Sequence, residues 1–109
     1  MKLFDNGVDQ IGVMLGVLNP FHRFSTDIGV GGLARWTDSR LDILAIHSDQ
    51  ENTGQCRWFF KDAKRQFKTI CVWAINDQVL QAALERYGFT PQTEIDGKGE
   101  VLTGMRWDA

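Results

Sequence analysis

The stretch from Glu51 to Phe89 decides the fold, and it reads ENTGQCRWFFKDAKRQFKTICVWAINDQVLQAALERYGF. Its first half has apolar residues at helical spacing, which predicts an amphipathic helix. These apolar residues are Cys56, Phe59, Phe60, Ala63 and Phe67. The run from Ile70 to Ile75 has no polar alternation, which is typical of a central strand buried on both faces. A second helix then ends at Gly88, a residue typical of the position after a helix C-terminus.

This helix–strand–helix unit has one obvious place for a ligand, the start of its first helix. Backbone N–H groups at a helix N-terminus attract an anion, and Gly54 lies where the absence of a Cβ lets a phosphate approach closely. The alternative is a plain turn in which Thr53 caps the helix. The basic residues of this helix fit a solvated face, or else contacts to ligand phosphates with Arg57 first. The residues alone leave both pairs of readings open.

The segments before this unit are expected to add three strands. Ile11 to Leu18 is apolar, contains two glycines and predicts a buried strand. Ile28 to Trp36 and Leu41 to His47 predict two further strands, and we expect the second of these to be mostly buried on both faces.

The remaining segments complete the sheet. Residues 1–10 are polar and hold the turn signal Asp5-Asn6-Gly7, and Phe21 to Asp27 predicts a loop or a single helical turn. Thr90 to Ile95 predicts a strand, Asp96 to Gly99 a hairpin turn, and Glu100 to Trp107 the returning strand. The resulting order β-β-β-α-β-α-β-β predicts an α/β (α+β) domain with a mixed central sheet and helices packed on it.

Composition narrows the class of protein. The chain of 109 residues fits a single globular domain over residues 1–109. A net charge of −2 and a pI near 5.6 argue against a nucleic-acid partner, which usually requires a basic face. The sequence shows neither a signal peptide nor a run long enough to span a membrane, so we expect a cytoplasmic protein without membrane contact. Cys56 and Cys71 lack metal-ligand spacing, so we expect no metal and interpret both as small buried apolar residues.

The central unit resembles the core of the GNAT (GCN5-related N-acetyltransferase) family. The family's loop, Gln/Arg-x-x-Gly-x-Gly/Ala, aligns with Glu51, Gly54 and Cys56, and Glu51 departs from it in charge. An Asn after the next strand and a Gly-Phe pair after the next helix also match, at Asn76 and Gly88-Phe89. The motifs cover residues 51–89. Short GNAT-like proteins of tailed phages are similar in length and in their degenerate motifs, which would place the protein in the cytoplasm of a host cell.

The resemblance implies a coenzyme and its site. GNAT proteins bind acetyl-coenzyme A, with the pyrophosphate at the helix N-terminus and the pantetheine arm between two splayed central strands. The cofactor-binding residues that it implies here are Ile46, Ser48, Gly54, Gln55, Cys56, Arg57 and Asn76. Asn76 could instead cap the following helix, and the two readings stay open.

Catalysis needs a base for the amine and an acid for the departing thiolate. The family's usual acid, a Tyr, is replaced by Leu84, and Tyr87 lies one turn later on the same helical face. His47, at the end of its strand, has a side chain suited to a base. Both residues also have ordinary structural readings, as a packed Tyr and a satisfied His. Asp42 and Glu100 are alternative carboxylates without a spacing argument.

Two functions from different classes follow. The first is acetyl-coenzyme A-dependent N-acetyl transfer to an amine, such as a lysine of a protein. The second is a catalytically inactive GNAT-like module that binds a partner protein. The missing Tyr and the altered loop favour it, as does the segment Phe21 to Asp27, which is too short for the two helices that most GNAT domains carry near their start. A structural component with neither property is a third reading.

Overall fold

The computed structural model describes residues 1–16, 19–49, 54–95 and 99–109. Within these ranges the elements follow the order β-α-β-β-β-α-β-α-β-β. The strands are β1 (Leu3–Val8), β2 (His22–Thr26), β3 (Val30–Trp36), β4 (Arg40–Ser48), β5 (Thr69–Trp73), β6 (Thr90–Ile95) and β7 (Val101–Asp108). The helices are α1 (Gln10–Met14), α2 (Gln55–Gln66) and α3 (Gln78–Arg86). The chain is therefore an α+β domain.

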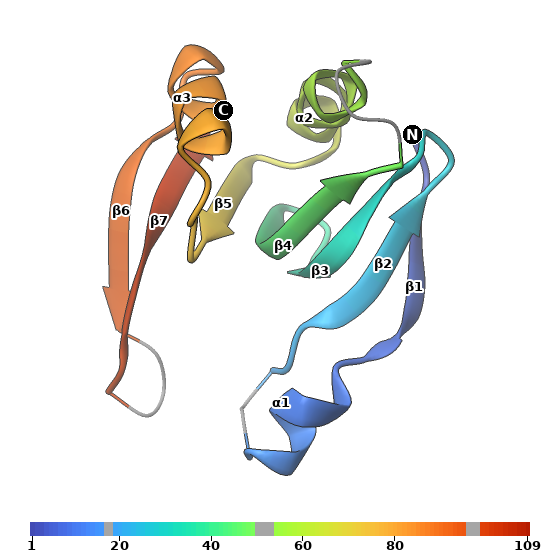
Figure 1. Cartoon of the computed structure of the whole chain (residues 1–109), viewed down its shortest axis with the longest axis vertical. Coiled ribbons are helices and arrows are strands. Elements are labelled where there is room, and N and C mark those ends of the chain that lie inside the picture. Colours follow the sequence, from blue (N-terminus) through green and yellow to red (C-terminus); the bar gives the residue numbers. More distant parts are fainter. Residues whose placement is uncertain (17–18, 50–53, 96–98) are drawn as a thin grey trace.

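The strands form one mixed sheet in the order β1-β2-β3-β4-β5-β7-β6 (Figure 1). Only β4 and β5 run parallel among the described strands, and every other neighbouring pair is antiparallel. Parallel neighbours need a crossover connection, and α2 lies in the connection from β4 to β5. Along this crossover the start of α2 follows the end of β4. The candidate site lies at this junction.

The core lies between the sheet and the two longer helices, which Figure 1 shows together at one side of the sheet. Phe59, Phe60 and Ala63 of α2 are buried, as their spacing predicted, and Phe67 after the helix is buried as well. The Phe60 ring lies 5.9 Å from the ring of Tyr87, which follows α3. Aromatic packing therefore joins the two helices.

Helix α3 begins and ends as its sequence requires, with one correction. Asp77 caps its N-terminus, because the Asp77 carboxylate accepts a hydrogen bond of 2.8 Å from the Val79 N–H. The alternative that Asn76 caps this helix was therefore wrong. At the other end Gly88 has a φ of 90°, and the Phe89 N–H donates to the Leu84 carbonyl at 3.0 Å. This is a Schellman-type ending, and it confirms the predicted role of Gly88.

The N-terminal quarter differs from its prediction. The expected buried strand Ile11–Leu18 is in part the helix α1, none of whose residues is buried, and residues 17 and 18 lie outside the described ranges. Asp9 starts this helix by accepting a hydrogen bond from the Ile11 N–H. The expected loop or helical turn at Phe21–Asp27 is the strand β2, in which Phe24 alternates with polar neighbours and is buried. Cross-strand pairing overrode the local signals here.

The first ten residues contain a strand that the local signals hid. The turn signal Asp5-Asn6-Gly7 lies inside β1, where Gly7 has a φ of 113° and the register with β2 shifts between Asp5 and Val8. Such a shift is a bulge-like irregularity at the edge of a sheet. The same Asn-Gly pattern that often makes a hairpin turn here bends an edge strand.

The central strands agree with prediction over part of their length. Burial on both faces of β4 holds for Leu41 to Ile43, whereas Ala45 and His47 are exposed. The predicted strand Ile70–Ile75 ends at Trp73, and Ala74 is exposed with a φ of 53°. The predicted Thr53 cap, the role of Glu51 and most of the hairpin turn at Asp96–Gly99 lie outside the described residues.

One glycine of β7 is fixed by its neighbour. Gly104 pairs with Trp73 of β5, and a Cβ added at Gly104 would lie 2.1 Å from the Val72 carbonyl oxygen. A side chain at this position would collide with backbone rather than with a movable side chain, so β5 and β7 approach closely only because residue 104 is glycine.

No helix within the described ranges has both the length and the apolar content that crossing a membrane requires.

Candidate functional site

An opening lies between β4 and β5. The parallel ladder begins at Arg40–Thr69 and ends at Ile43–Val72, although β4 continues to Ser48. On the side away from β3, residues 44–47 of β4 have no strand beside them among the described residues. Strand backbone without a neighbour offers N–H and C=O groups to a ligand.

A bulge in β4 coincides with the start of this opening. Ala34 of β3 pairs with Ile43 and Leu33 pairs with Ala45, so Leu44 has no partner in the register. Ile46 then packs against the core, whereas its neighbours Ala45 and His47 are exposed. The bulge thus changes the face of the sheet to which each side chain in the last part of β4 points.

The end of β4 is joined to the start of α2. The Ser48 hydroxyl donates a hydrogen bond of 2.6 Å to the Gln55 side-chain oxygen, and Gln55 is the first residue of α2. Gly54 precedes it as the N-cap residue, with a φ of 80°. Because it is glycine, it makes no side-chain hydrogen bond to the helix. Among the described residues, a Cβ added at Gly54 would meet nothing within 4 Å. The helix N-terminus therefore lies beside the end of β4, and no described residue fills the space over Gly54.

The first turn of α2 suits an anion, although the Asp49 carboxylate and the Gln55 amide both lie within 3.4 Å of the position that a Cβ at Gly29 would take. The first turn of α2 contains no acidic residue, and Arg57 in that turn is exposed. Cys56 is half-buried against the core, and burial raises the pKa of its thiol. A protonated Cys56 adds no negative charge, so the helix dipole is not opposed by a side chain of this turn.

The other predicted site residues lie apart from this helix start. Asn76 is exposed, just beyond the end of β5. Tyr87 is half-buried and its ring packs on Phe60, on the side of the sheet that carries the helices. His47 is exposed and pairs with Gly31, and it points to the opposite side because its neighbour Ile46 faces the core. The structure thus groups the predicted cofactor-binding residues of β4 and α2, and it does not bring Tyr87 and His47 together.

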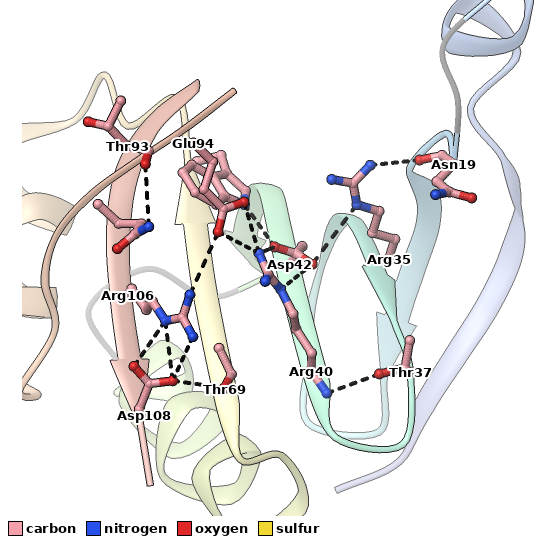
Figure 2. Close-up of polar contacts among 12 residues, drawn as sticks. Asn19, Arg35, Thr37, Arg40, Asp42, Thr69, Thr93, Glu94, Arg106 and Asp108 are labelled. Carbon is pink, nitrogen blue, oxygen red and sulfur yellow. Dashed lines mark hydrogen bonds and ion pairs between the residues drawn. The ribbon is translucent and has the colours of Figure 1, made fainter. Parts of the chain in front are cut away.

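Sequence reasoning missed a polar cluster on the face of the sheet that lies away from α2 and α3 (Figure 2). Asp42 of β4 is 7% exposed and its carboxylate accepts hydrogen bonds from three donors. Two come from Arg40, from Nε and Nη2 at 3.0 Å each, and one comes from Trp73 Nε1 at 2.9 Å. Asp42 had been considered only as an alternative base, and the structure places it in a satisfied ion pair.

The cluster extends across the sheet as alternating charges. Arg40 also donates to Glu94 of β6 at 3.1 Å, and Glu94 lies 3.7 Å from Arg106 of β7. Arg106 pairs with Asp108 at 2.9 Å, and Asp108 accepts from the Thr69 hydroxyl of β5 at 2.8 Å. The hydrogen bonds from Arg106 and Thr69 hold the pKa of Asp108 below its usual value, and the bond to Asp42 raises the pKa of Arg40.

A groove of about 770 Å³ lies beside this cluster. Its walls come from Asn19, Pro20 and His22, and from the end of β3, the β3–β4 turn, β4 and Glu94. Arg35 stands in it with its guanidinium 4.5 Å from the Phe21 ring and hydrogen-bonded to the Asn19 carbonyl at 2.8 Å. The available signal was Arg40-x-Asp42, two charges on one side of a strand that is otherwise apolar.

In the part of the chain that the structure describes, no three His, Cys, Asp or Glu side chains come together as a metal site. No protein-family model matches the chain, and comparisons with curated proteins and with solved structures give no significant match.

Proposed function

We propose that the chain binds acetyl-coenzyme A in the opening between β4 and β5 and transfers the acetyl group to an amine. One observation carries the proposal: among the described residues the β4–β5 ladder ends at Ile43–Val72, whereas β4 itself continues toward the start of α2. The mixed sheet with a central parallel pair that parts is what the resemblance to GNAT proteins leads us to expect. The proposed location is the cytoplasm.

The two ends of the opening suit two different parts of the coenzyme, the pantetheine arm and the pyrophosphate. The pantetheine arm is an extended chain with two amides, and it can hydrogen-bond to the edge of residues 44–47 as an added strand would. The pyrophosphate then reaches the N-terminus of α2, where Gly54 leaves space and Arg57 supplies a positive charge. Asn76 follows β5, the strand on the other side of the opening, and is our candidate partner for an amide of the pantetheine arm.

Binding has more support than catalysis. Tyr87 is our candidate acid, and its ring contact with Phe60 leaves the role of its hydroxyl open to test. His47 is our candidate base, acting through water from the exposed side of β4. A thioester releases a thiolate, a tolerable leaving group, so transfer can proceed with a weak acid.

A titration with acetyl-coenzyme A, followed by melting temperature, tests the proposal. A hundredfold excess of ligand over its Kd stabilises a fold by about 2.7 kcal/mol. For a domain of this size we expect a rise on the order of 10 °C. Wild type without any shift at millimolar coenzyme would overturn the proposed function.

Gly54→Asp and Gly54→Asn form a matched pair for the helix N-terminus. Asp and Asn are nearly equal in size, tolerate a positive φ and cap helices equally well, so both variants should fold. Asn blocks the space over residue 54, whereas Asp also adds a negative charge where the pyrophosphate is expected. Gly54→Asp should bind roughly tenfold or more weakly than Gly54→Asn. Equal affinities would place the pyrophosphate elsewhere.

Catalysis needs its own assay, for which release of the coenzyme thiol with amine and peptide acceptors serves. Tyr87→Phe keeps the ring that packs on Phe60 and removes the hydroxyl. If Tyr87 is the acid, turnover should fall roughly 10²-fold with little change in coenzyme affinity. If His47 is the base, His47→Ala in the same assay should also lower turnover with little change in coenzyme affinity.

A second candidate function, an inactive module that binds a partner protein, is favoured by the surface of α1. Ile11 is 69% exposed and Met14 is 84% exposed on a helix with no buried residue. Apolar side chains gathered on one short element are typical of a binding surface. Retained coenzyme binding without turnover for any acceptor would favour this second function.

A further inference from the structure

The point where β4 and β5 part, after the pair Ile43–Val72, is here called the fork. Asp42 lies directly before the fork on β4, and Trp73 directly after it on β5. The hydrogen bond of 2.9 Å from Trp73 Nε1 to Asp42 Oδ1 therefore crosses between the two strands at the fork. The bond is buried, and it joins residues 31 positions apart in the chain.

The burial of the Asp42 carboxylate must be compensated, because burying a carboxylate is costly unless its hydrogen bonds are complete. Among the described residues Asp42 is the buried charged side chain, and no buried polar side-chain atom lacks a partner. Arg40 holds Asp42 from its own strand and is itself held by Glu94, as Figure 2 shows. The carboxylate is thus fixed in position, ready to receive the indole N–H.

We propose that Asp42 and Trp73 are positioning residues that set where β4 and β5 part, and thereby the width of the opening for the coenzyme. This inference rests on the proposed function. The ladder that ends at the fork has only four residue pairs, and parallel pairing is slightly less stable per residue than antiparallel pairing. A short ladder frays at its end, so a strong side-chain bond there decides how many pairs stay closed.

The two partners of Asp42 have separable effects. Trp73→Phe removes the N–H donor at the fork and leaves both Arg40 bonds to Asp42. Asp42→Asn keeps Oδ1 as an acceptor for Trp73, and it turns an amide N–H toward Arg40 Nε. Affinity for the coenzyme should fall mainly in Trp73→Phe, which loses the hydrogen bond between Trp73 and Asp42. The free energy of unfolding should fall in both variants. A merely structural role would lower affinity in proportion to stability in both.

Isothermal titration calorimetry with acetyl-coenzyme A measures the affinity. It is done well below the melting temperature of each variant. We expect Trp73→Phe to bind on the order of tenfold more weakly than wild type and Asp42→Asn less than about threefold more weakly. Equal losses in the two variants, or none in Trp73→Phe, would overturn the inference. If Trp73→Phe does not fold, Asp42→Ala takes its place, because it removes the acceptor instead.

Amide hydrogen exchange in the ligand-free protein gives a readout independent of the coenzyme. Exchange of the ladder residues 41–43 and 70–72 should be faster in Trp73→Phe than in Asp42→Asn at matched stability. The same exchange rates in both variants would overturn the inference whatever the coenzyme does. Wild type that fails to bind acetyl-coenzyme A would instead refute the proposed function, and exchange alone would then decide the role of the fork.

Discussion

The two faces of the sheet differ in how they are held together. The face under α2 and α3 is filled by aromatic and aliphatic side chains, with Phe59 and Phe60 fully buried. The opposite face carries the alternating charges from Arg35 and Asp42 to Asp108 (Figure 2). Apolar burial is non-directional and supplies most of the stability, whereas hydrogen-bonded charges require one geometry. We infer that the helix-covered face holds the fold and the charged face fixes the strand arrangement around the opening.

The largest effect should come from the helix-covered face. Phe60→Ala removes a ring that contacts Phe59, Tyr87 and Phe89, and truncating a core aromatic costs roughly 3–5 kcal/mol. Urea denaturation measures the loss. A loss below about 1 kcal/mol would show that this face does not carry the stability assigned to it.

Asp42→Ala should have the next largest effect, on the charged face. Breaking a buried pair costs roughly 3–5 kcal/mol, and we expect the lower end because Arg40 reaches solvent and keeps Glu94 as a partner. Urea denaturation again measures it. A loss equal to that of Phe60→Ala would remove the distinction between the two faces.

Arg106→Gln should cost below about 1 kcal/mol, because Arg106 and Asp108 are partly exposed and water screens their attraction. The loss should shrink further in 1 M salt. Phe60→Ala serves as the comparison, since its loss should not shrink with salt. A salt-independent loss for Arg106→Gln would indicate packing rather than charge.

The smallest effect concerns pH. The pKa of Asp108 lies below its usual value near 3.8, so its contribution is complete above that value and is lost as pH falls through the lowered pKa. The stability of wild type should therefore fall on acidification below about pH 4, partly through Asp108. In Asp108→Asn the free energy of unfolding should fall less steeply with decreasing pH. Urea unfolding midpoints from pH 5 to pH 2 measure this slope. An unchanged slope would assign it to other carboxylates such as Asp5 and Asp27, whose pKa values are also lowered.

The sequence was sufficient where local periodicity and tertiary burial coincide. The spacing of Phe59, Phe60 and Ala63 predicted α2 and its buried side, and Gly88 predicted the end of α3, because both signals depend on residues a few positions apart. The N-terminal quarter failed for the opposite reason. Strands β1 and β2 exist because they pair with each other and with β3, and nothing local in Asp5-Asn6-Gly7 reveals a partner.

The candidate site divides in the same way. Gly54 and the helix start were predicted from adjacent residues. The bulge at Leu44 and the bond between Asp42 and Trp73 were not, because they depend on the register of β4 with β3 and β5. A charged residue inside an apolar strand was visible, but its partner Trp73 lies 31 residues away.

The contact between Gly104 and the Val72 carbonyl has a consequence for mutational scanning. Every substitution at residue 104 should reduce the amount of folded protein, so selection for activity alone would mark Gly104 as strongly as a residue that touches a ligand. No described residue lies within 4 Å of a Cβ placed at Gly54, and Asn there should leave abundance nearly unchanged. A scan read twice, once for abundance and once for coenzyme binding, should therefore separate these two glycines.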